Sequence, residues 1–173
     1  MNLFDRLFGK KTAINEAAQA LEQALDAVIT INARNEVIFF NAAAERLWGY
    51  SRQEVMGQNV KMLVPMEIRA KHDDYVNANR STGQDKIVGT SRDVEVDRRD
   101  GTKVWCRLSL SRVQLADGVG YTAFVQDITA EREARKIVDE TLEQALDAVV
   151  TIDEQNNVTF FNKAAELLWG LTR

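Results

Sequence analysis

The sequence is poor in the residues that build covalent or metal frameworks. Its 173 residues contain one cysteine, one proline and one histidine. The single thiol, Cys106, excludes an internal disulfide framework, and no apolar run approaches the roughly 20 residues needed to cross a bilayer. The start MNLFDRLFGKK also lacks the apolar core of a secretory signal. We therefore expect a cytoplasmic protein without a membrane span.

Positive charge is likewise not in excess. The formal net charge is -4 and there is no long basic block, so nucleic acid is not an expected partner. The sequence also has no serine, histidine and aspartate pattern with a nucleophile turn, and no glycine-rich phosphate loop. We expect no enzyme activity from these residues. Apolar residues nevertheless make up 45% of the chain, which is enough for a folded core.

What the chain does have is an internal repeat. Residues 21–52 and 142–173 align without gaps, 121 positions apart, and 22 of the 32 aligned residues are identical. The second copy ends at Arg173, whereas the first continues for roughly eighty residues. We expect a longer natural protein whose output portion follows. We also expect residues after about 150 to be disordered or docked on a neighbouring chain, because half a module cannot bury its apolar face.

The first module opens with helical periodicity that changes to strand character. Apolar residues recur every three or four positions, which predicts an amphipathic helix, at Ile14, Ala17, Leu21, Ala24, Leu25 and Val28. The stretches AVITI at 27–31 and VIFF at 37–40 then predict a hairpin with Asn35 in its turn.

Capping signals delimit three helices after the hairpin. Asn41 is a good N-cap for AAAERLWG, and Ser51 with Glu54 forms a capping box for a second, short helix. Pro65 suits the first turn of a longer helix over residues 66–80.

The rest of the module has the pattern of a β-meander. Turn residues, first at Arg99-Asp100-Gly101 and then at Asp117-Gly118, separate three predicted strands over 86–98, 102–113 and 119–129. In the middle strand alternation places apolar residues on one face, at Val104, Cys106, Leu108 and Leu110.

A charged helical segment follows and is predicted to connect the two modules over residues 130–148. Its apolar residues recur at coiled-coil spacing, at Ala134, Val138, Thr141, Ala145 and Ala148, or at Ile137, Leu142 and Leu146. We expect this helix to pair with its twin in a homodimer, although the same residues could pack a helix on a sheet.

The order of these elements resembles the PAS sensor fold over roughly residues 25 to 129. The specific marks are the turn at Asp100-Gly101, the segment FFNAAAERLWGYSRQEVMGQNV and the closing triplet Asp127-Ile128-Thr129. The resemblance implies an α+β fold, a five-stranded antiparallel sheet with helices on one face around a small-molecule pocket. The domains are then an N-terminal segment and cap helix at 1–26, a PAS domain at 27–129, the connector at 130–148 and the start of a second PAS domain at 149–173.

Different PAS domains bind different cofactors, or none. The photoreactive flavin subclass has a cysteine in a G-x-N-C motif, and here Gly57-Gln58-Asn59-Val60 lacks it. Photochemical adduct formation is therefore not expected, while non-covalent FAD binding stays open.

A narrower resemblance concerns the long helix and the strand after it. The stretch His72-Asp73-Asp74-Tyr75, followed by Ile87-Val88-Gly89 and Arg92, resembles the haem-binding PAS domains of rhizobial oxygen-sensing histidine kinases and enteric direct oxygen sensors. The resemblance implies that His72 is the proximal ligand of haem b iron. It also implies that Arg92 donates hydrogen bonds to bound oxygen. A neutral imidazole and a permanently charged guanidinium suit these two roles.

The same resemblance supplies the remaining site residues. Tyr75 belongs to the matching helix, and Ile87, Leu108 and Leu110 match apolar residues that crowd the gas-binding face. Thr90 stands where the enteric sensor has a methionine ligand, which favours five-coordinate iron. Ala78 stands where the rhizobial proteins have an arginine near a haem propionate, so Lys86 or Arg80 would take that role.

Other interpretations of these residues remain open from the sequence. His72 could be a partly exposed helix histidine beside two aspartates, and Arg92 a solvated strand residue paired with Asp93 or Asp97. Trp48 is predicted to pack in the core rather than against a cofactor.

The leading prediction is a cytoplasmic haem-based sensor of oxygen or a related diatomic gas. It would act as a homodimer on an effector domain in the same chain. That effector could be a soluble chemotaxis receptor of the biofilm-dispersion type, a histidine kinase or a cyclic-di-nucleotide enzyme. The rivals are a ligand-free dimerisation and relay module, acting through helices 12–26 and 130–148, and a flavin redox sensor.

Overall fold

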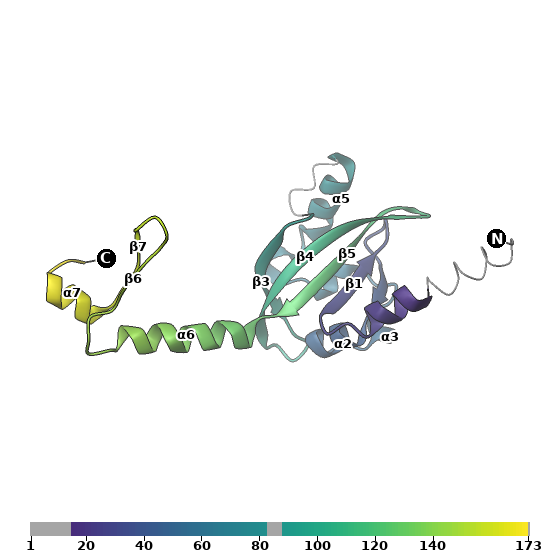
Figure 1. The fold of residues 1–173 in the computed structure, drawn as a ribbon. Coiled ribbons are helices and arrows are strands. Elements are labelled where there is room, and N and C mark those ends of the chain that lie inside the picture. The colour runs from purple at the N-terminus through teal and green to yellow at the C-terminus, as the bar shows by residue number, and fades with distance from the viewer. Residues whose placement is uncertain (1–14, 83–87, 173) are drawn as a thin grey trace, which may run out of the picture. The chain divides into compact units, whose positions relative to one another are not determined.

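The computed structural model describes residues 15–82 and 88–172, and these form two compact units. The first unit runs to Ile128 and the second from Thr129 onward. Figure 1 traces the elements of each unit along the chain.

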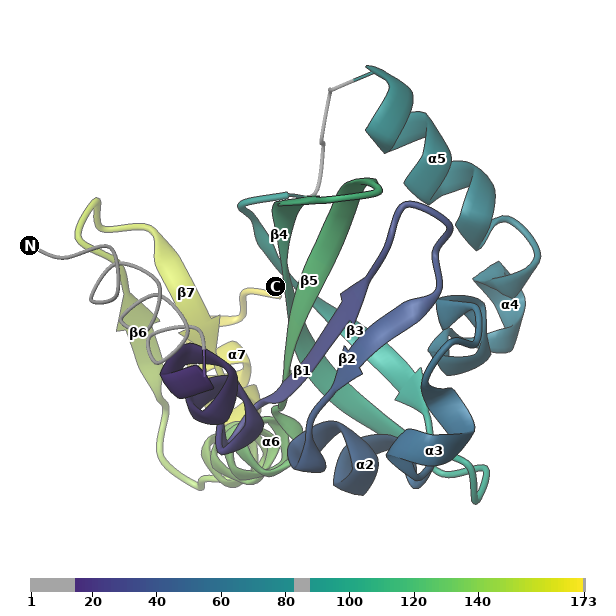
Figure 2. The same cartoon turned by 90° about the vertical axis from the view of Figure 1, so that its right-hand side faces the viewer.

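The first unit is built on one antiparallel sheet of five strands in the order β2-β1-β5-β4-β3. The strands are β1 (Ala27–Ile31), β2 (Val37–Phe40), β3 (Ser91–Asp97), β4 (Lys103–Leu115) and β5 (Gly118–Asp127). The helices are α2 (Ala42–Trp48), α3 (Arg52–Val55), η1 (Val60–Leu63), α4 (Met66–Arg69) and α5 (His72–Thr82). Figure 2 shows α3, α4 and α5 along one side of the sheet, so the core lies between them and the strands. This is the predicted α+β architecture.

The predicted hairpin and caps are confirmed. Asn35 has φ 63° in the β1–β2 turn, a left-handed conformation that asparagine tolerates. Asn41 caps α2 by accepting from Ala44 N–H, and Gly49 ends that helix with φ 76°. Ser51 forms the predicted capping box at the start of α3.

Asn41 also joins the incoming chain to the sheet. Its Oδ1 accepts hydrogen bonds from the N–H groups of Val28 and Ala44, at 2.9 Å each. Its Nδ2 donates to the carbonyls of Leu21 and Asp26, at 3.0 Å each. One fully buried carboxamide therefore holds the end of the N-terminal helix, β1 and α2 together.

The face assignment of β4 is confirmed as well. Val104 and Cys106 are buried, and Leu108 packs against the core at its edge. Across the antiparallel pair, Val94 faces Cys106 and Val96 faces Val104. Residues that pair directly across two antiparallel strands point to the same face, so β3 and β4 contribute to one apolar layer.

The single long helix expected over 66–80 is wrong, because the chain forms α4 and α5 with a break at Ala70 and Lys71. The Lys71 N–H bonds to the carbonyl of Ile68, three residues back, instead of continuing the helical ladder. The two helices are also held to different partners. Arg69 donates to the carbonyls of Met62 and Val64, whereas α5 is bonded to the β1–β2 turn.

The strand expected from residue 86 begins later, at Ser91. Gly89 has φ 76°, which is incompatible with extended backbone, and Val88 makes only an isolated parallel bridge with Leu110. Lys86 and Ile87 lie outside the described residues.

The N-terminal helix is shorter than the periodicity suggested. Its described part spans residues 15–22, Leu25 is almost fully exposed, and Val28 belongs to β1. Leu25 and Val28 are therefore not members of an apolar helix face.

The second unit repeats the start of the first. It consists of α6 (Thr129–Glu143), β6 (Val150–Ile152), β7 (Val158–Phe161) and α7 (Lys163–Trp169). Asn162 repeats the contacts of Asn41, bonding Val149 N–H, Ala165 N–H and the carbonyls of Leu142 and Asp147. Residues after 149 form a hairpin and a helix, in place of the disorder expected for them. Docking of these residues on a neighbouring chain stays a prediction.

The connector helix ends before its predicted boundary. Helix α6 stops at Glu143, so Ala145, Leu146 and Ala148 lie beyond it and cannot continue a coiled-coil stripe. The Asn162 amide, which accepts the Val149 N–H and donates to the Asp147 carbonyl, holds this stretch in a turn into β6 instead.

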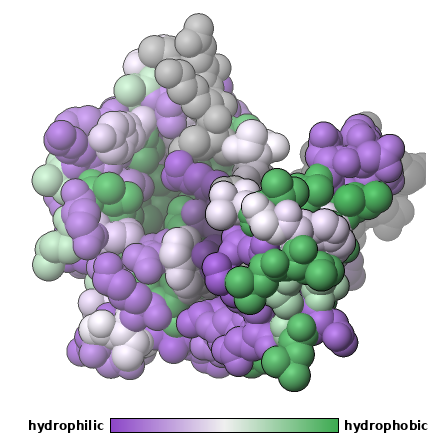
Figure 3. Space-filling model, turned by 90° about the vertical axis from the view of Figure 1, so that its left-hand side faces the viewer, coloured by the Kyte–Doolittle hydropathy of each residue, from purple (hydrophilic) through white to green (hydrophobic). Residues whose placement is uncertain are grey.

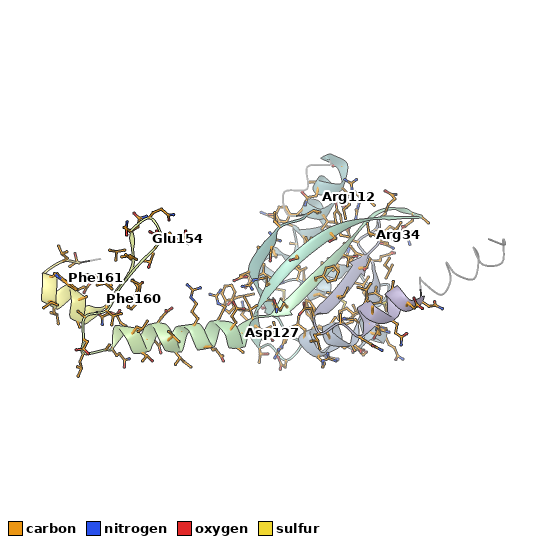
Figure 4. The ribbon with its side chains drawn as sticks, viewed as in Figure 1. Arg34, Arg112, Asp127, Glu154, Phe160 and Phe161 are labelled. Carbon is orange, nitrogen blue, oxygen red and sulfur yellow. The ribbon has the colours of Figure 1, made fainter. Side chains whose placement is uncertain are left out.

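Equivalent residues of the two repeats differ in burial. Leu47 and Trp48 are 6% and 4% exposed, whereas their counterparts Leu168 and Trp169 are 67% and 53% exposed. Figure 3 shows such apolar side chains (green) open to the surface among polar ones. The rings of Phe161 and Trp169 still pack at 5.7 Å, as Phe40 and Trp48 do at 6.2 Å, and Figure 4 labels Phe161 in this unit.

Replacing Asn41 with alanine should destabilise the first unit by roughly 2–4 kcal/mol, because a helix cap is lost and buried N–H and C=O groups lose their partners. Denaturant unfolding measures the change. Gln53→Ala, at an exposed position of α3, is the control and should change stability by less than about 0.5 kcal/mol. Similar losses in both variants would contradict the role of the carboxamide.

Cys106 should be inert in the folded protein. Burial raises the pKa of its thiol to about 12, with the charge of Asp127 adding to the effect and that of Arg98 opposing it. At pH 8 the reactive thiolate is therefore scarcer than in an ordinary thiol by about a thousandfold. A chromogenic thiol reagent should react with Cys106 of the native chain only as fast as the chain unfolds, and with the denatured chain at once. Fast labelling of native protein would show that the thiol is accessible.

Candidate functional site

The one histidine opens helix α5 and has a ring nitrogen without a partner. His72 is half-buried, and its Nδ1 is buried and makes no hydrogen bond to any described residue. Burial lowers the pKa of His72, the charge of Asp73 opposes this, and the charge of Arg92 lowers it further. The imidazole is therefore neutral at pH 7, the form that can donate a lone pair to a metal.

Arg92 belongs to the same side of the sheet as the core. In the β3–β4 register it pairs with Leu108, so both side chains point to the face that carries Cys106 and Leu110. Arg92 is exposed, at the edge of this face, yet its charge acts on His72. The structure therefore brings a neutral imidazole from α5 and a guanidinium from β3 to one region.

Apolar side chains border this region. Leu108, Val88 and Val76 are partly buried and pack against the core, and Leu110 is half-buried beside them on β4. Tyr75 and Thr90 are exposed, so neither is placed inside an apolar pocket. The predicted site residues Lys86 and Ile87 lie outside the described part of the chain.

The competing partners suggested for Arg92 are bonded elsewhere. Asp93 pairs with Arg107 at 3.1 Å, and Asp97 lies 3.6 Å from the ammonium of Lys103. An ion pair of Arg92 with either aspartate is not among the contacts of the described residues. Trp48 is buried and donates to the carbonyl of Leu63 at 2.9 Å, so it packs in the core as predicted.

Sequence reasoning missed a polar network that surrounds α5. Asp73 accepts from Asn35 at 2.8 Å and from Asn59 at 3.1 Å, and Arg80 donates to Asn35 Oδ1 at 2.9 Å. Arg80 also donates to the carbonyl of Val119 at 3.0 Å, so its guanidinium is committed to structural contacts. The one signal in the sequence was Asn35 itself, a turn residue whose side chain could reach beyond its turn.

One groove of the first unit lies away from these residues. It measures about 190 Å³ and lies around Asp26, Arg46, Leu47, Arg98 and Asp127. Figure 4 places Asp127 at one end of the sheet and Arg34 and Arg112 at the other. At the Asp127 end, Arg98 donates a hydrogen bond to Asp127 at 3.2 Å, and α6 begins two residues later.

Residues 15–82 and 88–172 lack two other kinds of feature, a metal-binding cluster and a membrane-spanning helix. No cluster of three or more histidine, cysteine, aspartate or glutamate side chains there could hold a metal ion. No helix among the described residues has both the length and the apolar character to span a membrane.

Comparison with protein families identifies the module. Residues 15–128 match the family described as PAS fold, and residues 135–173 match a second family described as PAS domain. The PAS domain of an HTR-like protein from Haloarcula marismortui has a TM-score of 0.55 at 20% identity, covering 71% of this chain and 98% of that one. At this identity the likeness shows the fold alone.

Two relatives are closer in sequence. The oxygen sensor protein DosP of Escherichia coli is 38% identical over 155 residues, which are 87% of this chain and 19% of that protein. The sensor protein FixL of Bradyrhizobium diazoefficiens is 37% identical over 115 residues, or 66% of this chain and 23% of that protein. The chain thus spans about a fifth of the length of each.

Proposed function

Because this chain belongs to the PAS family, we propose that its first unit is a sensor module that binds haem b through His72 and detects oxygen or a related diatomic gas. The relatives DosP and FixL, named as an oxygen sensor and a sensor protein, support a sensing role. The role is one of binding and relay, without catalysis by this chain.

The observation that carries the proposal is the buried, unpartnered Nδ1 of His72. A buried polar atom without a hydrogen bond costs roughly 1–3 kcal/mol, and ligation of a metal would offset that cost. The neutral imidazole offers one lone pair, and His72 is the only histidine of the chain. His72 would supply the one nitrogen ligand from the protein that a gas-binding haem requires.

Bound haem would supply an iron that binds a diatomic gas reversibly. The chain would supply the surroundings. Arg92 offers a charged hydrogen-bond donor from the inner face of β3, and the half-buried Leu108 and Leu110 on β4 would border the bound gas. A guanidinium remains charged at any physiological pH, so this donor does not switch off with acidity.

Relay would proceed from β3 along the sheet toward α6. Strand β3 pairs with β4 and β4 with β5, and Ile128 N–H bonds the carbonyl of Trp105 where β5 ends. Helix α6 begins at the next residue and has no buried residue, with Ile137 and Val138 exposed. These apolar residues suit pairing with a second copy, which would carry the change to an effector domain in the same chain.

His72→Ala should abolish haem retention, because it removes the proposed iron ligand. It should leave the fold intact, because His72 is only half-buried and lies at the first position of α5. The parent should show a sharp Soret band after haem is added to the purified apoprotein, and the variant should not. Adding free imidazole should restore binding to His72→Ala, because it replaces the lost ligand. Retention of the parent spectrum by the variant would refute ligation by His72, and a yellow flavin spectrum of the parent would favour the redox rival.

Arg92→Ala should keep haem and speed oxygen dissociation by roughly ten- to a hundredfold, the effect of losing one charged hydrogen bond. Stopped-flow measurement of oxygen release tests this. Arg107→Ala, which removes an arginine from the opposite face of the neighbouring strand, is the matched control and should leave the rate unchanged. Equal rates in the two variants would exclude a role for Arg92.

A further inference from the structure

Helix α5 carries His72, the proposed haem ligand, yet its side chains are little buried against the core. From His72 to Ser81 every residue is half-buried or exposed, and Val76 is the one that packs against the core as a partly buried apolar residue. The helix is also preceded by the break at Ala70 and Lys71. Apolar contacts alone therefore leave the orientation of this helix weakly determined.

Polar contacts supply what burial does not, and they act at both ends of α5. Asp73, in the first turn, accepts from Asn35 and from Asn59, with the ammonium of Lys61 3.7 Å away. Arg80, in the last turn, donates to the Asn35 carboxamide at 2.9 Å and to the carbonyl of Asn32 at 3.3 Å.

Asn35 is the common partner of both ends. Its side chain donates through Nδ2 to Asp73 and accepts through Oδ1 from Arg80, and the residue is 3% exposed. Its backbone is fixed as well, because its carbonyl accepts from Val60 N–H at 2.9 Å. The tip of the β1–β2 turn is therefore a rigid anchor for the helix.

Turn geometry alone does not account for this arrangement. Asn156 occupies the equivalent position of the second repeat and has φ 62°, against 63° for Asn35. The described part of the second unit contains no counterpart of α5. An asparagine in this turn is thus compatible with the hairpin by itself, and the bonds to α5 are an addition in the first unit.

We propose that Asp73 and Arg80, joined through Asn35, position His72 by clamping both ends of α5 to the β1–β2 turn. Asp73 is covalently next to His72, so a carboxylate fixed on three side chains fixes the start of the helix from which the imidazole projects. This inference rests on the proposed haem function. Asp73, Arg80 and Asn35 are positioning residues, and the bonds of Arg80 to Asn35, Asn32 and Val119 replace the propionate contact expected for it from the sequence.

Two pairs of variants of the full chain separate the clamp from general stability. Asp73→Ala removes the first-turn contacts, and Asp74→Ala removes the neighbouring exposed carboxylate, which has the same favourable place near the helix N-terminus. Asn35→Gly removes the common partner but keeps a residue that accepts positive φ, and Asn156→Gly makes the same change in the second repeat.

The first readout is amide hydrogen exchange of the apoprotein. Asp73→Ala and Asn35→Gly should speed exchange across residues 72–81 by roughly tenfold or more relative to β4, because a charged hydrogen-bond network is lost. Asp74→Ala and Asn156→Gly should leave α5 as in the parent. Unchanged exchange in the first two variants would overturn the clamp, whether or not haem binds.

The second readout is the haem-loaded protein. Haem transfer to an acceptor globin should be faster by roughly tenfold in Asp73→Ala and Asn35→Gly, and the midpoint potential should shift, because the ligand is less well placed. Asp73→Asn, which keeps an oxygen acceptor, should recover part of the loss. Faster exchange without any change in haem transfer or potential would show a structural clamp that does not position His72. A parent that takes up no haem would refute the proposed function and this role with it, while the exchange data would still report on the clamp.

Discussion

The antiparallel register of β3, β4 and β5 is the constraint on which the site depends. It aligns Arg92 with Leu108, and Leu108 with Val125, so one face of the sheet carries a guanidinium in line with buried apolar side chains. A slip of one residue would send Arg92 to the outer face and put a carboxylate, Glu95 or Asp97, at the buried position that Val96 now occupies, which would cost far more than any contact there could return. The apolar layer that stabilises the fold therefore also determines which charge can reach His72.

Local chemistry made half of this fold predictable. The caps at Asn41 and Ser51 and the turn at Asn35 are specified by residues within four positions of each other, so they could be deduced from the sequence. The late start of β3 follows from the positive φ of Gly89, whereas the break before α5 goes with contacts between distant segments. Asp73 bonds a turn 38 residues earlier, and no periodicity records such a contact. Resemblance to a family indicates His72 and Arg92, whereas the network that holds α5 has a single signal in the sequence, the turn residue Asn35.

The two repeats show how far local sequence determines structure and where it stops. Asn41 and Asn162 make the same set of bonds, so a hairpin, a cap and a helix form in each copy. The burial of equivalent side chains nevertheless differs between the two copies, since Trp48 is 4% exposed and Trp169 is 53% exposed. The hydrogen-bond partner of the Trp48 ring comes from later in the first module, where the backbone carbonyl of Leu63 accepts its N–H. Secondary structure here is a property of some thirty residues, while the core is a property of the whole module.

Within the first unit, the burial of the strands and helices differs between a firmly packed half and a lightly held half. Strand β1 is buried along nearly all of its length, and the Asn41 carboxamide ties it to both neighbouring helices. Strand β3 has one buried residue, Val96, and α5 is held chiefly by polar contacts near solvent. Polar contacts at partly exposed positions exchange with water more readily than buried apolar contacts are broken. A ligand bound between α5 and β3 would therefore act on the elements whose positions cost least to change, and the packed half would serve as the fixed frame against which that movement is transmitted.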